Sequence, residues 1–108
     1  MYLVLDRAPA GESAPPRIHV PALARNLDAL SDLLKGTELM APRVLVSDAW
    51  FDAIQGLRMI RSLRAAVNTK PDAVDDAAAV LSDIAACERH LMTAHQESIA
   101  FHLEKDGA

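Results

Sequence analysis

Hydrophobic positions recur at two different spacings, and the spacing assigns most segments to strands or helices. Residues 2–5 form a short apolar run that is typical of a strand. Residues 8–18 hold three prolines and a glycine, so we expect a mobile Pro-rich loop. From Pro21 to Gly36 leucines recur every three or four residues, which predicts a helix that starts at the proline and stops at the glycine.

The middle of the chain predicts a second strand followed by a helix. Residues 43–46 are a short apolar run after a proline and favour a strand. Ser47 has the features of a helix N-cap, and Val46 and Phe51 are spaced as a hydrophobic staple. This helix is expected to run to about Val67, with a buried face at Trp50, Ala53, Ile54, Leu57, Ile60 and Val67.

The last segment predicts a much longer helix. No glycine or proline interrupts residues 72–106, so a helix from about Lys70 to Lys105 would measure roughly 50 Å, against about 30 Å for the preceding one. Thr69 and Asp72 resemble a capping box at its start. In an antiparallel pair, residues beyond about Arg89 would extend past the partner helix. They would then pack on the N-terminal part, break into another helix or bind another chain, and the last case favours a homodimer.

We therefore expect one domain over residues 1–108, mostly α with a small β element. Its predicted α+β architecture is a short N-terminal β-α-β-like unit followed by a long antiparallel helical pair. Hydrophobic residues make up 51% of the chain and aromatics only 4%, which predicts a core of closely packed helices.

Charge and cysteine content narrow the function classes. The formal net charge of −4 argues against a general phosphate-backbone binder. A single cysteine, Cys87, excludes an internal disulfide framework and suits a reducing compartment. Without an evident signal peptide or long apolar stretch, and with many Ala and Arg residues, we expect a cytoplasmic bacterial protein.

Asp6 and Asp48 each follow a predicted strand. If those strands are parallel, both carboxylates lie at one sheet edge, where they could hold Mg²⁺. The alternative is that Asp6 merely ends a strand and Asp48 stabilises a helix start.

Two segments resemble parts of known families. VLDRA (4–8) and APRVLVSDAW (41–50) are similar to the opening half of PIN-domain nucleases, which implies metal binding by Asp6 and Asp48. LMTAHQES (91–98) resembles a later PIN segment, but His95 stands where that family requires Asp, so a nuclease of this kind would be inactive.

NLDALSDLL (26–34) is similar to the inhibitory helix of the barstar family of ribonuclease inhibitors. That resemblance implies that Asp28 and Asp32 face a basic enzyme. The alternative is an ordinary solvated helix face.

Histidines and arginines gather on the predicted long helices. Cys87 with His90, and His95 with His102, would share helix faces, as metal ligands, a pH-sensitive dimer seam or surface groups. Arg58, Arg61 and Arg64 form a basic flank. It could bind nucleic acid, although pairing with Asp75, Asp76 and Asp83 is the favoured interpretation.

No catalytic triad context or phosphate-binding loop is present. We therefore predict a non-enzymatic protein-binding module without a cofactor, such as an immunity protein, antitoxin or inhibitor of a basic toxin or enzyme. Its predicted contacts are Asp28, Asp32, His95 and His102. The alternatives are a degenerate PIN-like nuclease relative using Mg²⁺ at Asp6 and Asp48, and a small nucleic-acid-binding regulator.

Overall fold

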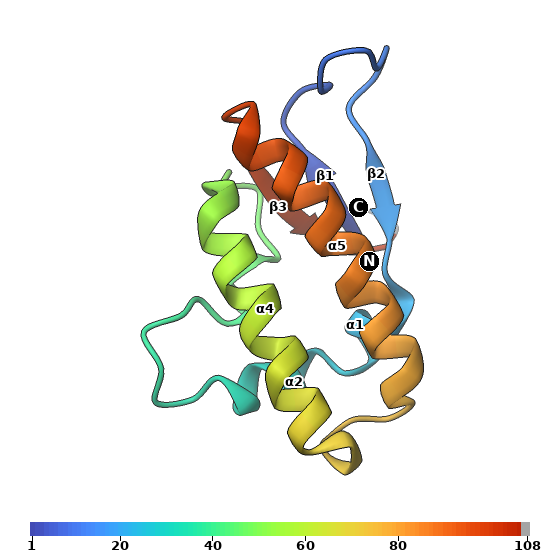
Figure 1. Cartoon of the computed structure of the whole chain (residues 1–108), viewed down its shortest axis with the longest axis vertical. Coiled ribbons are helices and arrows are strands. Elements are labelled where there is room, and N and C mark those ends of the chain that lie inside the picture. The colour runs from blue at the N-terminus through green and yellow to red at the C-terminus, as the bar shows by residue number, and fades with distance from the viewer. Residues whose placement is uncertain (107–108) are drawn as a thin grey trace.

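The computed structural model describes residues 1–106 and places helices against one face of a small sheet (Figure 1). The sheet has three antiparallel strands in the order β2-β1-β3. Along the chain the elements are β1 (Tyr2–Leu5), β2 (Arg17–His19), α1 (Pro21–Arg25), α2 (Leu27–Leu33), α3 (Pro42–Leu45), α4 (Ala53–Thr69), the 3-10 helix η1 (Pro71–Ala73), α5 (Ala77–Gln96) and β3 (Phe101–Glu104). The predicted α+β class, with strands near the N-terminus and a long antiparallel helical pair, is confirmed.

The helical pair forms because each helix has a continuous apolar face. Buried positions recur every three or four residues and turn toward the sheet and the other helix. Gly56 of α4 packs on the Phe101 ring of β3, where an added Cβ would lie 2.6 Å from the ring. The buried positions are Ala53, Gly56, Leu57, Met59, Ile60, Leu63 and Val67 in α4, and Val80, Ile84, Cys87, Leu91 and Ala94 in α5.

The sheet divides its side chains between two faces, because successive residues of a strand point to opposite sides. The register pairs Leu3 with both Ile18 and Leu103. These three residues face the helices, and Leu3 and Leu103 belong to the main core. Their neighbours along each strand face away from the helices and form the outer face of the sheet.

The predicted strand at 43–46 is wrong. Pro42 occupies the first turn of the short helix α3, and only Leu45 of the three apolar residues that follow it is fully buried. The predicted β-α-β-like unit with a parallel strand pair is therefore replaced by an antiparallel sheet whose third strand comes from the end of the described chain.

The last segment does not continue as one helix to Lys105. At the end of α5, Ser98 takes a left-handed conformation with φ 56°. The Ser98 N–H then donates to His95 O, and Ile99 N–H donates to Ala94 O. These two bonds form a Schellman motif, which ends the helix and releases residues 101–104 to pair with β1. With 20 residues in α5 and 17 in α4, the expected overshoot largely disappears.

Helix starts are displaced as well. The helix expected from Ser47 begins at Ala53, after Asp52. Val46 and Phe51 form bridges with Leu103 and Phe101 of β3 rather than a hydrophobic staple. The capping box expected at Thr69 is not formed, because residues 71–73 form η1 and the Asp76 carboxylate instead accepts the Ala79 N–H at 3.2 Å.

Asn26 divides the predicted first helix into α1 and α2. Its buried amide nitrogen donates to Ala22 O and Asp75 O, both at 2.9 Å, while its oxygen accepts the Asp75 N–H at 2.7 Å. This side chain fixes the α1–α2 junction to the connection that leads into α5.

Residues 17 and 18, which were expected in the Pro-rich loop, belong to β2. Among residues 1–106, no helix combines the length and apolar character needed to cross a membrane.

Candidate functional site on the outer face of the sheet

The outer face of the sheet gathers side chains from all three strands. Tyr2 of β1 lies opposite His19 of β2 and Glu104 of β3 in the register. Arg17 and His102 occupy the next row on the same face, on either side of Val4. The chain between α3 and α4 adds Trp50, which is the only tryptophan of the sequence. We call Tyr2, Arg17, His19, Trp50, His102 and Glu104 the outer-face cluster.

Trp50 is stacked flat on His102. The two ring centroids are 3.9 Å apart and the ring planes differ by 9°. Trp50 is 44% exposed, whereas His102 is 5% exposed. One face of the indole is thus fixed against the protein while much of the ring remains open to solvent.

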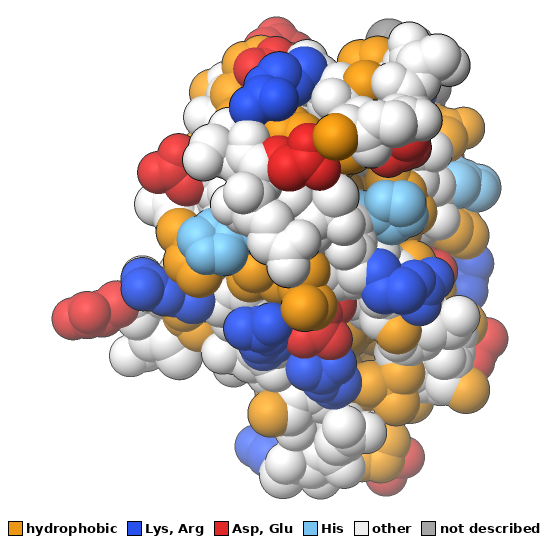
Figure 2. All heavy atoms as spheres, turned by 45° about the horizontal axis from the view of Figure 1, so that its top comes forward, with side chains coloured by type: hydrophobic (Ala, Val, Ile, Leu, Met, Phe, Trp, Pro, Cys, Tyr) orange, Lys and Arg blue, Asp and Glu red, His pale blue; other side chains and the backbone are white. Residues whose placement is uncertain are grey.

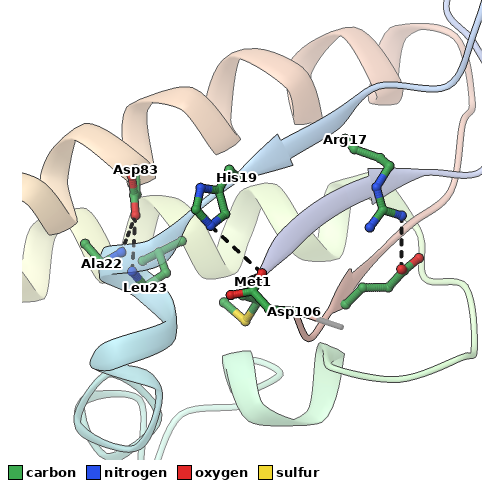
Figure 3. Close-up of polar contacts among 8 residues, drawn as sticks. Met1, Arg17, His19, Ala22, Leu23, Asp83 and Asp106 are labelled. Atoms are coloured by element: carbon green, nitrogen blue, oxygen red, sulfur yellow. Dashed lines mark hydrogen bonds and ion pairs between the residues drawn. The ribbon is translucent and has the colours of Figure 1, made fainter. Parts of the chain in front are cut away.

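His102 is held by two acceptors. Its Nδ1 lies 3.1 Å from the carbonyl oxygen of Ala49, and its Nε2 lies 2.9 Å from Glu104 Oε2. Arg17 donates to the other oxygen of Glu104 at 3.0 Å, as the contact between β2 and β3 in Figure 3 shows. The hydrogen bonds from His102 and then from Arg17 hold the pKa of Glu104 below its usual value.

The opposite side of the cluster is built around Tyr2. The Arg17 guanidinium lies 4.7 Å from the Tyr2 ring centroid, which is cation–π geometry. The His19 ring packs beside Tyr2 with centroids 5.0 Å apart. His19 also points toward Asp106, at 3.9 Å, and Asp106 accepts the Met1 ammonium at 2.6 Å (Figure 3).

Two adjoining clefts border this face. The nearer one, of about 280 Å³, is lined by residues 46–48 and 103–105 and therefore includes Asp48 and Glu104. The farther one, of about 470 Å³, shares Val46 and Lys105 with it and contains Asp28. Polar and charged groups thus lie beside one part of the outer face.

The predicted contact residues do not form one group. Asp28 and Asp32 are exposed on α2, as expected, and lie near Arg43 at 3.5 Å and Lys35 at 3.4 Å. His95 is exposed near the end of α5 and lines a separate cleft with Asp52. His102 belongs to β3, so the prediction that His95 and His102 share a helix face is wrong. Of the four, His102 lies in the outer-face cluster.

Asp6 and Asp48 are not brought together. The Asp6 N–H donates to Ala100 O just before β3, whereas Asp48 lies in the cleft beside Glu104. Four residues of β3 separate these positions, or about 13 Å at the rise of a strand. Within residues 1–106, no group of three or more His, Cys, Asp or Glu residues is arranged to hold a metal ion.

Cys87 and His90 also lack the features of a metal pair. Cys87 is buried in the core, and this burial, with a smaller effect from Asp83, raises the pKa of its thiol to about 12. The pKa of His90 is lowered, mainly by partial burial and then by Arg89.

The arginine flank pairs with a different acid from the ones predicted. Arg61 and Arg64 both donate to Glu88 of α5, and Arg61 Nε lies 2.8 Å from its carboxylate. Figure 2 shows basic side chains beside acidic ones on this helical face. Asp83 instead accepts the N–H groups of Ala22 and Leu23 at the start of α1 (Figure 3).

Sequence reasoning missed Trp50 and the strand that supports it. Trp50 was expected on the buried face of a helix, but it lies before α4 and is exposed. The alternation in residues 101–104 was the available signal, since Phe101 and Leu103 face the core while His102 and Glu104 do not. Comparison of the chain with protein-family models, with curated proteins and with solved structures returned no match.

Proposed function

We propose that this protein is a small non-enzymatic protein-binding module that contacts its partner through the outer-face cluster. The observation that carries the proposal is the presence of Trp50, Tyr2 and Arg17 on the sheet face opposite the helical pair. Trp, Tyr and Arg are the residue types most enriched among residues that dominate the energy of protein interfaces.

The geometry suits such a role because one face of the Trp50 ring is already packed against the protein. Stacking on His102 fixes one face of the indole, so docking on its exposed part would immobilise few additional rotamers. The clefts with Asp48, Glu104 and Lys105 would provide a polar rim around this anchor.

The charge balance favours a basic partner. The net charge is −4, and Asp28, Asp32 and Asp48 are all exposed. An immunity protein, antitoxin or other small cytoplasmic bacterial inhibitor of a basic toxin or enzyme fits this surface. Electrostatic attraction would mainly accelerate association with such a partner.

The competing hypotheses have less support. A PIN-like nuclease relative would need Asp6 and Asp48 at one Mg²⁺ site, and these residues lie at opposite ends of β3. A nucleic-acid-binding regulator would need a free basic flank, but Arg61 and Arg64 are paired with Glu88.

The test is affinity capture from the source organism with three tagged proteins: wild type, Trp50→Ser and Met92→Ser. Met92 is a matched control because it is 43% exposed on α5, close to the 44% of Trp50. We expect one protein to be retained stoichiometrically by wild type and Met92→Ser and lost from Trp50→Ser, with equal thermal stability of the variants.

Equal retention by Trp50→Ser, or bound nucleic acid without a protein, would contradict the proposal. Sedimentation of the purified chain separates a foreign partner from self-association. A homodimer that dissociates on Trp50→Ser substitution would assign the same surface to a second copy.

A further inference from the structure

His102 carries a hydrogen-bond arrangement that only one of its protonation states can satisfy. Both of its ring nitrogens lie within hydrogen-bond distance of groups that can only accept: the carbonyl of Ala49 and the carboxylate of Glu104. A neutral imidazole has a single N–H, so one nitrogen would direct its lone pair at an oxygen. An imidazolium donates to both.

We infer that His102 is held as an imidazolium and that its proton acts as a latch, which fixes Trp50 over the sheet. Partner binding at the outer face is therefore expected to require the protonated form of His102. The first part of this inference concerns the folded chain alone, and the coupling rests on the proposed function.

The charges around His102 support the cationic form. On β3 itself, Glu104 provides the compensating charge at 2.9 Å. From β2, Arg17 approaches Glu104 but donates to its other oxygen, so Oε2 stays available to His102. The segment before α4 contributes the Ala49 carbonyl, and its Asp48 shares a cleft with Glu104.

β1 adds no charge on this face. Val4 lies directly opposite His102 in the register, and Tyr2 lies beside it along the strand, under the Arg17 guanidinium. Since His102 is 5% exposed, water provides little alternative hydrogen bonding to its nitrogens.

Trp50 depends on the proton through two contacts. The imidazolium lies under the indole face at 3.9 Å, where a cation is attracted by the ring quadrupole. The same ring donates to Ala49, the residue before Trp50, and thereby holds the backbone of the segment. Loss of the proton removes the attraction and one of the two hydrogen bonds.

The direction of the pH dependence follows from these contacts. The latch is closed while His102 carries both ring protons and opens when one of them is lost, so raising the pH opens it. The hydrogen bonds from His102 and Arg17 lower the pKa of Glu104, so its carboxylate stays charged in mildly acidic solution. Partner affinity is expected to fall about tenfold over this rise in pH, since one cation–π contact and one hydrogen bond are lost.

The fluorescence of Trp50 reports the latch without any partner. Trp50 is the only tryptophan, and a protonated imidazole in contact with an indole quenches its emission. We expect emission to rise with pH in wild type, His95→Gln and His19→Gln, and to be constant in His102→Phe and His102→Gln. Two different His102 variants are used so that the test can still be made if one of them fails to fold.

Nitrogen NMR of the His102 ring gives the direct measurement. Two protonated nitrogens at pH 5.5 are expected, whereas one unprotonated nitrogen at that pH would overturn the latch. Fluorescence that is independent of pH, or that still changes in both His102 variants, would overturn it as well.

Binding titrations complete the test. If Trp50→Ser keeps the partner while the fluorescence and NMR results hold, the proposed function fails and the latch stands. If the partner binds through Trp50 with an affinity that does not vary with pH, the proposed function stands and the coupling fails.

Discussion

Ser98 shows how one residue in an unexpected conformation redirects the end of the described chain. Glycine usually occupies the left-handed position after a helix, because it has no Cβ. Here a serine takes that position with φ 56°, so the sequence carries no glycine signal where α5 ends. For this reason the sequence pattern did not indicate the strand β3, which contains His102.

Ser98→Gly is expected to stabilise the protein by about 0.5–1 kcal/mol, because glycine enters the left-handed region without strain. Ser82→Gly, at an exposed position inside α5, should do the opposite and cost about 0.5 kcal/mol. Urea denaturation measures the unfolding free energy of both variants. If both substitutions stabilise the protein, or both destabilise it, this account of the helix end is contradicted.

Asn26 uses both ends of its amide, which predicts a large effect for an isosteric change. Asn26→Asp removes the two donors to Ala22 O and Asp75 O and places a carboxylate against them. A loss of about 2–4 kcal/mol of unfolding free energy is expected. Asn68→Asp, at an exposed position of α4, is the control and should change stability by less than about 0.5 kcal/mol.

At the scale of elements, the helices were predictable and the strands largely were not. α4 and α5 bury apolar faces with a helical period, which a sequence displays directly. The run at 43–46 was taken for a strand because it is apolar and β-branched, but Pro42 and the burial of Leu45 alone favour a single helical turn. The pairing of β1 with β3 depends on residues about 100 positions apart, which local patterns do not reveal.

Gly56 lets α4 approach β3, and this contact predicts the sign of a substitution. In a free helix, alanine is preferred over glycine by about 1 kcal/mol. Here the added Cβ would meet the fully buried Phe101 ring, so Gly56→Ala is expected to destabilise by about 1–3 kcal/mol. Calorimetry should show a lower Tm for Gly56→Ala and an unchanged or higher one for the exposed neighbour Gln55→Ala.

The ion pairs between α4 and α5 predict a pH dependence. Hydrogen bonds from Arg64 and then Arg61 lower the pKa of Glu88 from 4.5 to about 2. The stabilisation is therefore complete above about pH 4.5 and is lost as the pH falls through about 2.

Glu88→Gln should cost about 1 kcal/mol at pH 7, a modest amount because both arginines are partly exposed. The gap between wild type and variant should narrow as denaturation is repeated at lower pH. A gap that stays constant down to pH 2.5 would show that Glu88 acts through packing and not through its charge.

At the scale of the molecule, the reactivity of the single thiol, Cys87, measures how often the core opens. Cys87 lies between the helices and the sheet, and burial raises its pKa to about 12. Native protein at pH 8 should react with a thiol reagent at least about a thousandfold more slowly than protein in urea, because only transiently opened molecules expose the thiolate. Rapid labelling of the native state would mean that the helical pair opens independently.

The α+β class and the helical pair could be predicted from the sequence because they follow from periodicity and composition. The candidate site could not, because it combines β1, β2, β3 and the segment before α4. Asp28 and Asp32 were correctly expected at the surface. His102 was selected as a helix residue, and Trp50, which the site depends on, was expected in the core.

The pairing of Leu3 with Leu103 has a consequence for the order of folding events. The α4–α5 hairpin needs only a short connection, whereas joining β1 to β3 closes a loop of about 100 residues, at an entropic cost about 2 kcal/mol above that of a ten-residue loop. We therefore expect the hairpin to form early and the sheet to close late. Until it closes, Tyr2 of β1 and Arg17 of β2 have not met Glu104 of β3, so the outer face is the last part of the molecule to acquire its shape.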